Sequence, residues 1–419
     1  MNIYINHLKL SGIKSIKTPI ELSFYNKTIT LPINLENTNI KAIYGANGIG
    51  KSAIIHGLDI YKSVILKEGY LYTEEAKDSL SELINKQTKT FNIEISFFIF
   101  NNEQNSLEKY KHELIIKESD NNFYIKEEKL IKVLTRNEKP LISILNGKIT
   151  TWSFSLDFKE HFINKLEKRS IVEVYKEIKL KEKDTLDKDL EVFHLLARNI
   201  FVSTESTYKD YLYFYSEDYN SINKPKKFNY KVDNNYTYVI DLKNKGLSKR
   251  HFKQMEQFIK VFKKEIINID LDFKIDKDKV YIDPYFVYEG YKVHLKFESS
   301  GIKKLADLFM FFKAKEAGGI IFIDELDASI NDVYLIKLLE YFKESNSGQL
   351  VFTTHNISPM EVLSDSKHSL DFITEKGQIT SWKKSGNYKA ANVYQSGLIK
   401  GLPFNVYPFD FVGVFEEED

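Results

Sequence analysis

The segment GANGIGKS at residues 45–52 constrains the fold of this chain more than any other feature of its sequence. It fits the pattern G-x-x-x-x-G-K-[ST], with the apolar run KAIY before it and an amphipathic stretch to about Leu66 after it. Glycines let a backbone wrap closely around a phosphate, and the N–H groups at a helix start then face the anion. The pattern therefore predicts a phosphate-binding loop between a buried strand and a helix. Every position of this loop is a candidate nucleotide contact: Gly45, Ala46, Asn47, Gly48, Ile49, Gly50, Lys51 and Ser52.

Two residues of the loop have side chains suited to phosphate chemistry. Lys51 is expected to reach the β- and γ-phosphates of ATP, and Ser52 is expected to be a ligand of Mg²⁺. A Gly-rich turn without a ligand is the alternative, but both flanks and the whole pattern favour the phosphate-binding interpretation.

In the segment IIFIDE at residues 320–325, four apolar residues are followed by two adjacent acids. Ligands of open α/β sheets bind where the strands end, and carboxylates are costly to bury there unless they serve a cation or a reaction. Asp324 is therefore a candidate Mg²⁺ ligand, and Glu325 is a candidate for polarising the attacking water. A strand capped by charges is the alternative.

The remaining pattern divides the chain into three parts. Residues 1–155 alternate apolar and polar residues in short runs, which predicts an antiparallel β subdomain next to the loop. Residues 156–284 are expected to form a mainly helical insertion with an irregular stretch at 207–235 and a hairpin at 267–283. Residues 285–419 alternate helix and buried strand, which favours a parallel α/β sheet.

Composition excludes several classes of protein. The chain has no cysteine, so disulfides, thiolate zinc sites and cysteine nucleophiles are excluded. Its 60 Lys and Arg residues against 59 Asp and Glu residues give no overall attraction to nucleic acid or anionic membrane. The start MNIYINHLKL has no signal-peptide pattern, and no apolar run is long enough for a membrane helix. We therefore expect a soluble, cytoplasmic protein.

With these motifs in this order, the chain resembles the ABC-type ATPases of the SMC, RecF and OLD-nuclease group. More narrowly, it is similar to AAA_15-type ATPases of bacterial antiphage defence systems, such as RloA-, AbiL- and PARIS-like systems. The resemblance covers about 1–150 and 285–419 and is weak between them. It implies an α/β fold in which an ABC-type head carries an antiparallel β subdomain and a mainly helical insertion.

The resemblance assigns a further motif to ESSGIKKL at residues 298–305. This segment looks like the ABC signature, which implies that Ser299, Ser300 and Gly301 bind the γ-phosphate of a nucleotide held by another subunit. The segment departs from the family pattern, because Glu298 replaces the usual Leu and Ser300 replaces a Gly. A serine N-cap on an ordinary helix is the alternative.

Three more residues match family positions. Asp327 in DELDAS matches the D-loop, which crosses the dimer interface, and His355 in VFTTHN matches the switch histidine. Lys14, in the basic stretch SGIKSIK, is similar to family residues that contact the nucleotide. The Q-loop glutamine is not evident, and Gln87 is a candidate.

The resemblance implies an ATPase that hydrolyses ATP with Mg²⁺ after two heads close into a homodimer or larger homo-oligomer. Since no effector domain is visible, we expect a switch or sensor in antiphage defence that controls a separate protein, a nuclease such as one of TOPRIM type. A RecF- or SMC-like DNA-repair ATPase is the alternative, and a non-hydrolysing scaffold is a weaker one. The Tyr- and Lys-rich stretch 208–231 suits an exposed loop, a partner surface or a nucleic-acid contact. Asp270 and Asp272 suit a hairpin better than a metal site.

Overall fold

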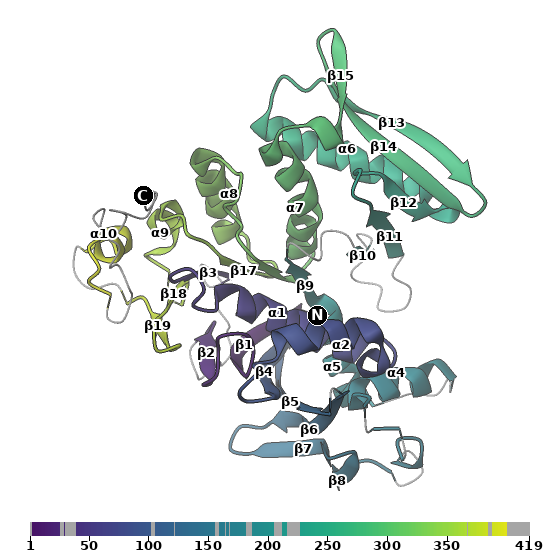
Figure 1. Cartoon of the computed structure of the whole chain (residues 1–419), viewed down its shortest axis with the longest axis vertical. Helices are drawn as coiled ribbons and strands as arrows, with labels where there is room; N and C mark the ends of the chain where they lie inside the picture. Colours follow the sequence, from purple (N-terminus) through teal and green to yellow (C-terminus); the bar gives the residue numbers. More distant parts are fainter. Residues whose placement is uncertain are drawn as a thin grey trace, which may run out of the picture.

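The computed structural model describes most of the chain: residues 2–25, 29, 39–101, 105–120, 122–155, 159–163, 165–166, 168–181, 187–204, 212–215, 227–366, 368–383 and 388–399. Two antiparallel sheets lie on opposite sides of a central, mostly parallel sheet (Figure 1).

The central sheet has the strand order β19-β18-β3-β17-β16-β9, and all its neighbours are parallel except β18 and β19. Its core strands are short, mainly apolar runs with no exposed position, which is typical of a parallel sheet covered on both faces. The strands are β3 (Ile40–Tyr44), β9 (Ile200–Ser203), β16 (Ile320–Ile323), β17 (Gln349–Thr353), β18 (Leu370–Ile373) and β19 (Ile379–Ser381).

Helices cover both faces of this sheet (Figure 1). Successive side chains of a strand point to opposite faces of the sheet, so the side chains of the central strands are divided between two cores. In β16, Ile320 and Phe322 join the core that contains α1 (Lys51–Leu66), α4 (Ile171–Lys181) and α5 (Lys188–Asn199). Ile321 and Ile323 join the other core, formed with α7 (Ser300–Glu316), α8 (Asp332–Glu344) and α9 (Ser358–Leu363). The short α10 (Ala390–Gln395) packs beside α9.

A seven-stranded antiparallel sheet, with the order β2-β1-β4-β5-β6-β7-β8, packs against the α1 side. Alternate residues of its strands are buried, as the sequence pattern predicts. The elements of this part are β1 (Asn2–Ser11), β2 (Ile20–Ser23), β4 (Thr90–Asn101), β5 (Ser106–Ser119), β6 (Asn122–Val133), β7 (Glu138–Leu145), β8 (Lys148–Trp152) and the helix α2 (Glu74–Leu83).

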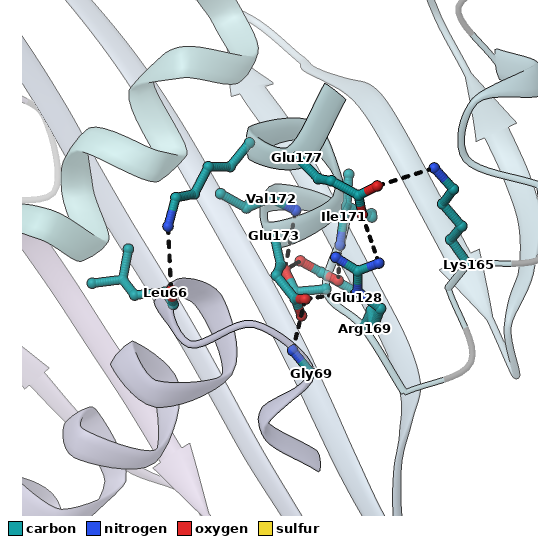
Figure 2. Close-up of polar contacts among 11 residues, drawn as sticks. Leu66, Gly69, Glu128, Lys165, Arg169, Ile171, Val172, Glu173 and Glu177 are labelled. Carbon is teal, nitrogen blue, oxygen red and sulfur yellow. Dashed lines mark hydrogen bonds and ion pairs between the residues drawn. The ribbon is translucent and has the colours of Figure 1, made fainter. Parts of the chain in front are cut away.

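Polar contacts fix the carboxyl end of α1 to this subdomain (Figure 2). The Glu173 carboxylate of α4 accepts from the backbone N–H of Gly69 at 2.9 Å and from Nε of Arg169 at 2.6 Å. Fully buried Glu128 of β6 accepts from the N–H of Ile171, the first residue of α4, at 2.9 Å. Because these carboxylates are buried and satisfied, α4 is held between β6 and the segment that follows α1. The helix that begins at the phosphate-binding loop is thereby anchored at its far end.

A third sheet, with the order β10-β11-β12-β14-β13 and β15 beside β14, packs one face on α6 (Lys245–Phe262). Tyr238, Ile282 and Phe286 of the sheet bury against Phe252 and Met255 of the helix. The strands are β10 (Leu212–Tyr215), β11 (Lys227–Val232), β12 (Tyr238–Asp241), β13 (Asn268–Asp276), β14 (Lys279–Tyr288) and β15 (Tyr291–His294). We call α6 together with β11–β15 the α6 lobe.

The α/β architecture with an antiparallel β subdomain confirms the expected fold class. The described part of 156–284 contains α4, α5 and α6, and it also contributes β9 to the central sheet and several strands to the third one. The predicted hairpin at 267–283 is present as β13 and β14. Within the stretch expected to be irregular, β10 and β11 are strands, while 207–211 and 216–226 lie outside the described residues. None of the described helices is long and apolar enough to cross a membrane.

Candidate nucleotide site at the carboxyl edge of the parallel sheet

The phosphate-binding loop lies between β3 and α1, as the sequence predicts. Gly48 and Gly50 have φ values of 74° and 114°, a backbone region that favours glycine. A Cβ on Gly50 would lie 2.8 Å from the side chain of Ile16. Gly50 is also the N-cap of α1, and no side chain caps this helix start. Its first N–H groups are therefore available to an anion.

Lys51 is buried beneath this loop. Its Nζ donates to the carbonyl oxygens of Gly45 at 2.8 Å and of Ala46 at 3.0 Å. Burial lowers the pKa of Lys51, while the nearby carboxylates of Asp324, Glu325 and Asp327 act in the opposite direction. The cation is thus held inside the loop and faces the acids that follow β16.

Asp324 and Glu325 follow β16 directly, and β17 lies between β16 and the loop strand β3. The buried hydroxyl of Thr353, the last residue of β17, contacts both acids. It donates to Oδ1 of Asp324 at 2.5 Å and accepts from the N–H of Glu325 at 2.8 Å. Glu325 has φ 48°, a strained conformation for a non-glycine residue. Thr353 therefore holds the two acids in a conformation that the chain alone would not favour.

His355 follows the same strand, so β17 brings it between the loop and the acids. Partial burial lowers the pKa of His355, and the positive charge of Lys51 lowers it further, whereas the carboxylates of Asp327, Glu325 and Asp324 act to raise it. The structure thus gathers Lys51, Asp324, Glu325 and His355 at one edge of the sheet.

Asp327 lies in the turn after the acids. Within the part of the chain that the structure describes, its buried Oδ1 has no hydrogen-bond partner. Buried carboxylate oxygens are rarely left without a donor, so this atom is suited to accept a bond from a group outside the described chain.

The Ser299–Gly301 segment forms the start of α7. The Ser299 side chain caps the helix by accepting from the N–H of Ile302 at 3.4 Å, and both Ser299 and Ser300 are exposed. A Cβ on Gly301 would lie 2.8 Å from the carbonyl oxygen of Ser329, so this helix start approaches the Asp327 turn of its own chain closely. Both the capping and the signature interpretation fit this geometry.

Lys14 lies in the turn after β1, next to the loop. Side-chain atoms of Ser15 and Ile16 in this turn lie 3.1 Å and 2.8 Å from the position that a Cβ on Gly50 would take. Lys14 is exposed, and its charge lowers the pKa of His56, a residue of α1 on which Asp324 acts in the opposite direction. The charges of Lys14 and Asp324 therefore act on the same residue of α1.

Gln87 is exposed in the turn before β4. The buried side chain of Asn85 joins this turn to the Lys14 turn, because it donates to the carbonyl oxygen of Lys14 at 2.6 Å and accepts from the N–H of Gln87 at 3.1 Å. The structure places Gln87 near the Lys14 turn, and its role as the Q-loop glutamine stays a prediction.

Sequence reasoning missed Thr353, Asn85 and His56. Only Thr353 had a signal in the sequence, as a hydroxyl residue at the end of an apolar strand just before His355. In the described ranges, no group of three or more His, Asp or Glu side chains is arranged to hold a metal ion by itself. Asp270 and Asp272 lie exposed on β13, as expected for a hairpin.

Comparisons with known proteins place these features in a family. The family described as "AAA domain, putative AbiEii toxin, Type IV TA system" matches residues 40–360, which include both the phosphate-binding loop and the acids. No curated protein matches the sequence.

Two solved structures are similar to this chain. An SMC head bound to the C-terminal winged-helix domain of ScpA is 16% identical, with a TM-score of 0.45 over 91% of this chain and 98% of that one. An SMC head with an extended coiled coil, bound to the C-terminal domain of ScpA from Pyrococcus furiosus, is 16% identical, with a TM-score of 0.42 over 94% of this chain and 100% of that one. Since the family match spans most of the chain, the protein belongs to the family described as AAA domain, putative AbiEii toxin, Type IV TA system.

Proposed function

We propose that this protein binds ATP with Mg²⁺ and hydrolyses it at a site shared between two heads. The observation that carries this proposal is the strand order β3-β17-β16, which brings Lys51, His355 and the Asp324–Glu325 pair to one edge. The residues present fit the ligand: the loop offers the N–H groups of a helix start that no side chain caps, and a lysine, for the phosphates. The hydroxyl of Ser52 and the carboxylate of Asp324 are ligands that Mg²⁺ prefers.

The chemistry assigned to this chain is positioning and charge stabilisation. Lys51 and the N–H groups of the loop hold the phosphates, and Glu325 accepts a hydrogen bond from water and orients it for in-line attack on the γ-phosphorus. When bound, Mg²⁺ neutralises charge on the phosphate oxygens. His355 acts as a further polar contact near the γ-phosphate.

Two features support the use of a second head. The start of α7, with exposed Ser299 and Ser300, lies beside the Asp327 turn, and these two serines are reachable from outside the chain. Among the described residues, the buried Oδ1 of Asp327 has no hydrogen-bond donor, so this turn has capacity for a further one. Pairing of two heads would cover the turn and add the N-terminus of α7 to the partner's nucleotide site.

Glu325→Gln tests this mechanism. The variant should still bind ATP but hydrolyse it slowly, so ATP-bound dimers should persist in size-exclusion chromatography with light scattering. Glu344→Gln, an exposed change at the end of α8, is the matched control. If Glu325→Gln neither slows hydrolysis nor prolongs the dimer, the role of Glu325 is wrong.

We further propose that the ATPase is a switch controlling a separate effector in antiphage defence, as in the AAA_15-type systems that it resembles. The matched family's description names a toxin of a type IV toxin–antitoxin system, and this is consistent with a two-component arrangement. Co-expression with the neighbouring gene product and pull-down, with and without ATP, is the test. Failure to capture a partner, together with ATP-dependent duplex binding that weakens steeply with salt, would favour the RecF-like alternative.

A further inference from the structure

Glu298, the residue just before Ser299, is a buried carboxylate in a position where the ABC pattern has an apolar residue. Its side chain is 5% exposed. Oε1 accepts from the hydroxyl of Tyr288 at 2.5 Å, while Oε2 accepts from the N–H of Ser299 at 3.2 Å and from Nζ of Lys263 at 3.5 Å. Both carboxylate oxygens of Glu298, the residue that departs from the pattern, therefore accept hydrogen bonds.

The three donors come from three different segments. Tyr288 is the last residue of β14, Lys263 follows the end of α6, and Ser299 is the N-cap of α7. Burying an ionised carboxylate is unfavourable unless its oxygens are satisfied, so the arrangement is stable only while these segments stay together. Glu298 thus joins the α6 lobe to the start of α7.

Lys263 has a second role in this cluster. Its Nζ lies 4.7 Å from the centre of the Tyr288 ring, so the same cation contacts both Glu298 and the tyrosine that donates to Glu298. A negative charge at a helix start opposes the binding of another anion there, because both use the same N–H groups and the same dipole. By pairing with Glu298, Lys263 offsets that charge next to Ser299.

We propose that Glu298 is a positioning residue: it holds the Ser299 turn on the α6 lobe and so couples that lobe to the nucleotide site. The inference rests on the proposed function in one respect, namely that Ser299 serves a nucleotide held by a second head. Displacement of the α6 lobe, for example by a protein that binds it, would then change the activity of a site to which the lobe contributes no reacting group.

A simple helix-stabilising charge is the competing explanation. Any acid at a helix start stabilises the helix through the helix dipole and needs no tyrosine to do so. Tyr288→Phe separates the two explanations, because it keeps the charge and removes one of the bonds to the lobe.

The test uses the full chain with Glu298→Leu, Glu298→Gln and Tyr288→Phe, and with Glu289→Leu as a matched control at an exposed position of the same lobe. Hydrogen–deuterium exchange follows the amides of 299–303 and, separately, those of the phosphate-binding loop. ATP hydrolysis gives kcat and KM, and a fluorescent ATP analogue gives the affinity of the single head.

In Glu298→Leu, we expect exchange at 299–303 to rise at least about tenfold while exchange in the loop stays unchanged. We expect kcat to fall at least about tenfold, with the affinity for the analogue within about twofold of wild type. Tyr288→Phe should show the same pattern to a smaller extent, and Glu298→Gln, which keeps one acceptor oxygen, should recover part of both losses. Glu289→Leu should match wild type.

Unchanged exchange at 299–303 in Glu298→Leu overturns the proposal, and so does unchanged kcat despite faster exchange. Equal loosening of the 299–303 amides and of the phosphate-binding loop would show a general structural role and would also overturn it. If wild type does not hydrolyse ATP at all, the proposed function fails, and the exchange data alone then decide whether Glu298 holds the Ser299 turn.

Discussion

The hydroxyl of Thr353 donates a 2.5 Å hydrogen bond to the carboxylate of Asp324 and accepts another from the backbone of the next residue, Glu325. One fully buried side chain on β17 therefore fixes both acids at the end of β16. It also lies two residues before His355, so the strand that carries the histidine holds the acids as well.

Thr353→Val should impair hydrolysis more than binding. Valine has nearly the same shape but can neither donate to Asp324 nor accept from Glu325, so the strained Glu325 backbone is free to relax. We expect kcat to fall about 10- to 100-fold, with the affinity for ATP within about threefold of wild type. Thr380→Val, at an exposed position of β19, is the control. Equal effects of both variants, or no effect of Thr353→Val on kcat, would contradict the positioning role.

Gly50→Ala and Gly48→Ala form a matched pair in the loop. Both glycines have positive φ, but a Cβ on Gly50 would meet Ile16 at 2.8 Å, whereas one on Gly48 has no heavy atom within 4 Å. Each change should cost about 1 kcal/mol or more in backbone strain. Only Gly50→Ala should also disturb the Ile16 turn, and adding Ile16→Ala should restore part of its nucleotide affinity. The measurements are calorimetric binding of ATP and urea unfolding. Rescue of Gly48→Ala by Ile16→Ala would contradict the assignment of the clash.

Mixing two inactive variants tests the shared site. Lys51→Met removes the phosphate-binding lysine, and Ser299→Arg blocks the start of α7, so each alone should be inactive. A mixed dimer keeps one intact site, composed of the loop of one chain and the α7 start of the other. Random exchange should then restore roughly a quarter of wild-type hydrolysis, since half of the dimers are mixed and each has one working site. An ATPase that works as a single head would show activity in Ser299→Arg alone and no gain on mixing.

His56 predicts a pH dependence of stability. Burial, together with the positive charge of Lys14, lowers its pKa from 6.5 to about 4, and Asp324 acts in the opposite direction. Since the unfolded chain takes up this proton more readily than the folded one, the stability contribution is fully present above pH 6.5. It is lost as the pH falls toward about 4. The free energy of unfolding of wild type should therefore decline in this window by roughly 1–2 kcal/mol more than that of His56→Gln. Urea unfolding between pH 4 and 7 measures the difference, with His7→Gln as a control. Parallel curves for wild type and His56→Gln would contradict the prediction.

Much of the fold class and the main site residues could be predicted from local sequence. The loop at 45–52 has the residue type that the phosphate-binding pattern requires at every defined position, and the run before Asp324 is apolar throughout. Both motifs can therefore be recognised without tertiary information. The meander of β4–β7 is predicted equally well, because alternation in neighbouring strands repeats at short range.

Contacts between distant segments could not be predicted in this way. Residues 200–203 were expected to belong to a helical insertion, yet they pair with β16 as the edge strand of the central sheet. Periodicity shows how apolar and polar residues alternate within a segment, but it does not show which other strand the segment will pair with.

The phosphate-binding loop, the acidic strand end and the serine at the start of a helix can each be recognised from a local pattern of residue types. The position of β17 between the loop and the acids, the contact of Thr353 with both acids, and the hydrogen bonds of Tyr288 and Lys263 to Glu298 are known only from the folded chain. Strand order and buried hydrogen bonds depend on segments up to hundreds of residues apart in sequence meeting in one core, and a local pattern does not record which segments meet.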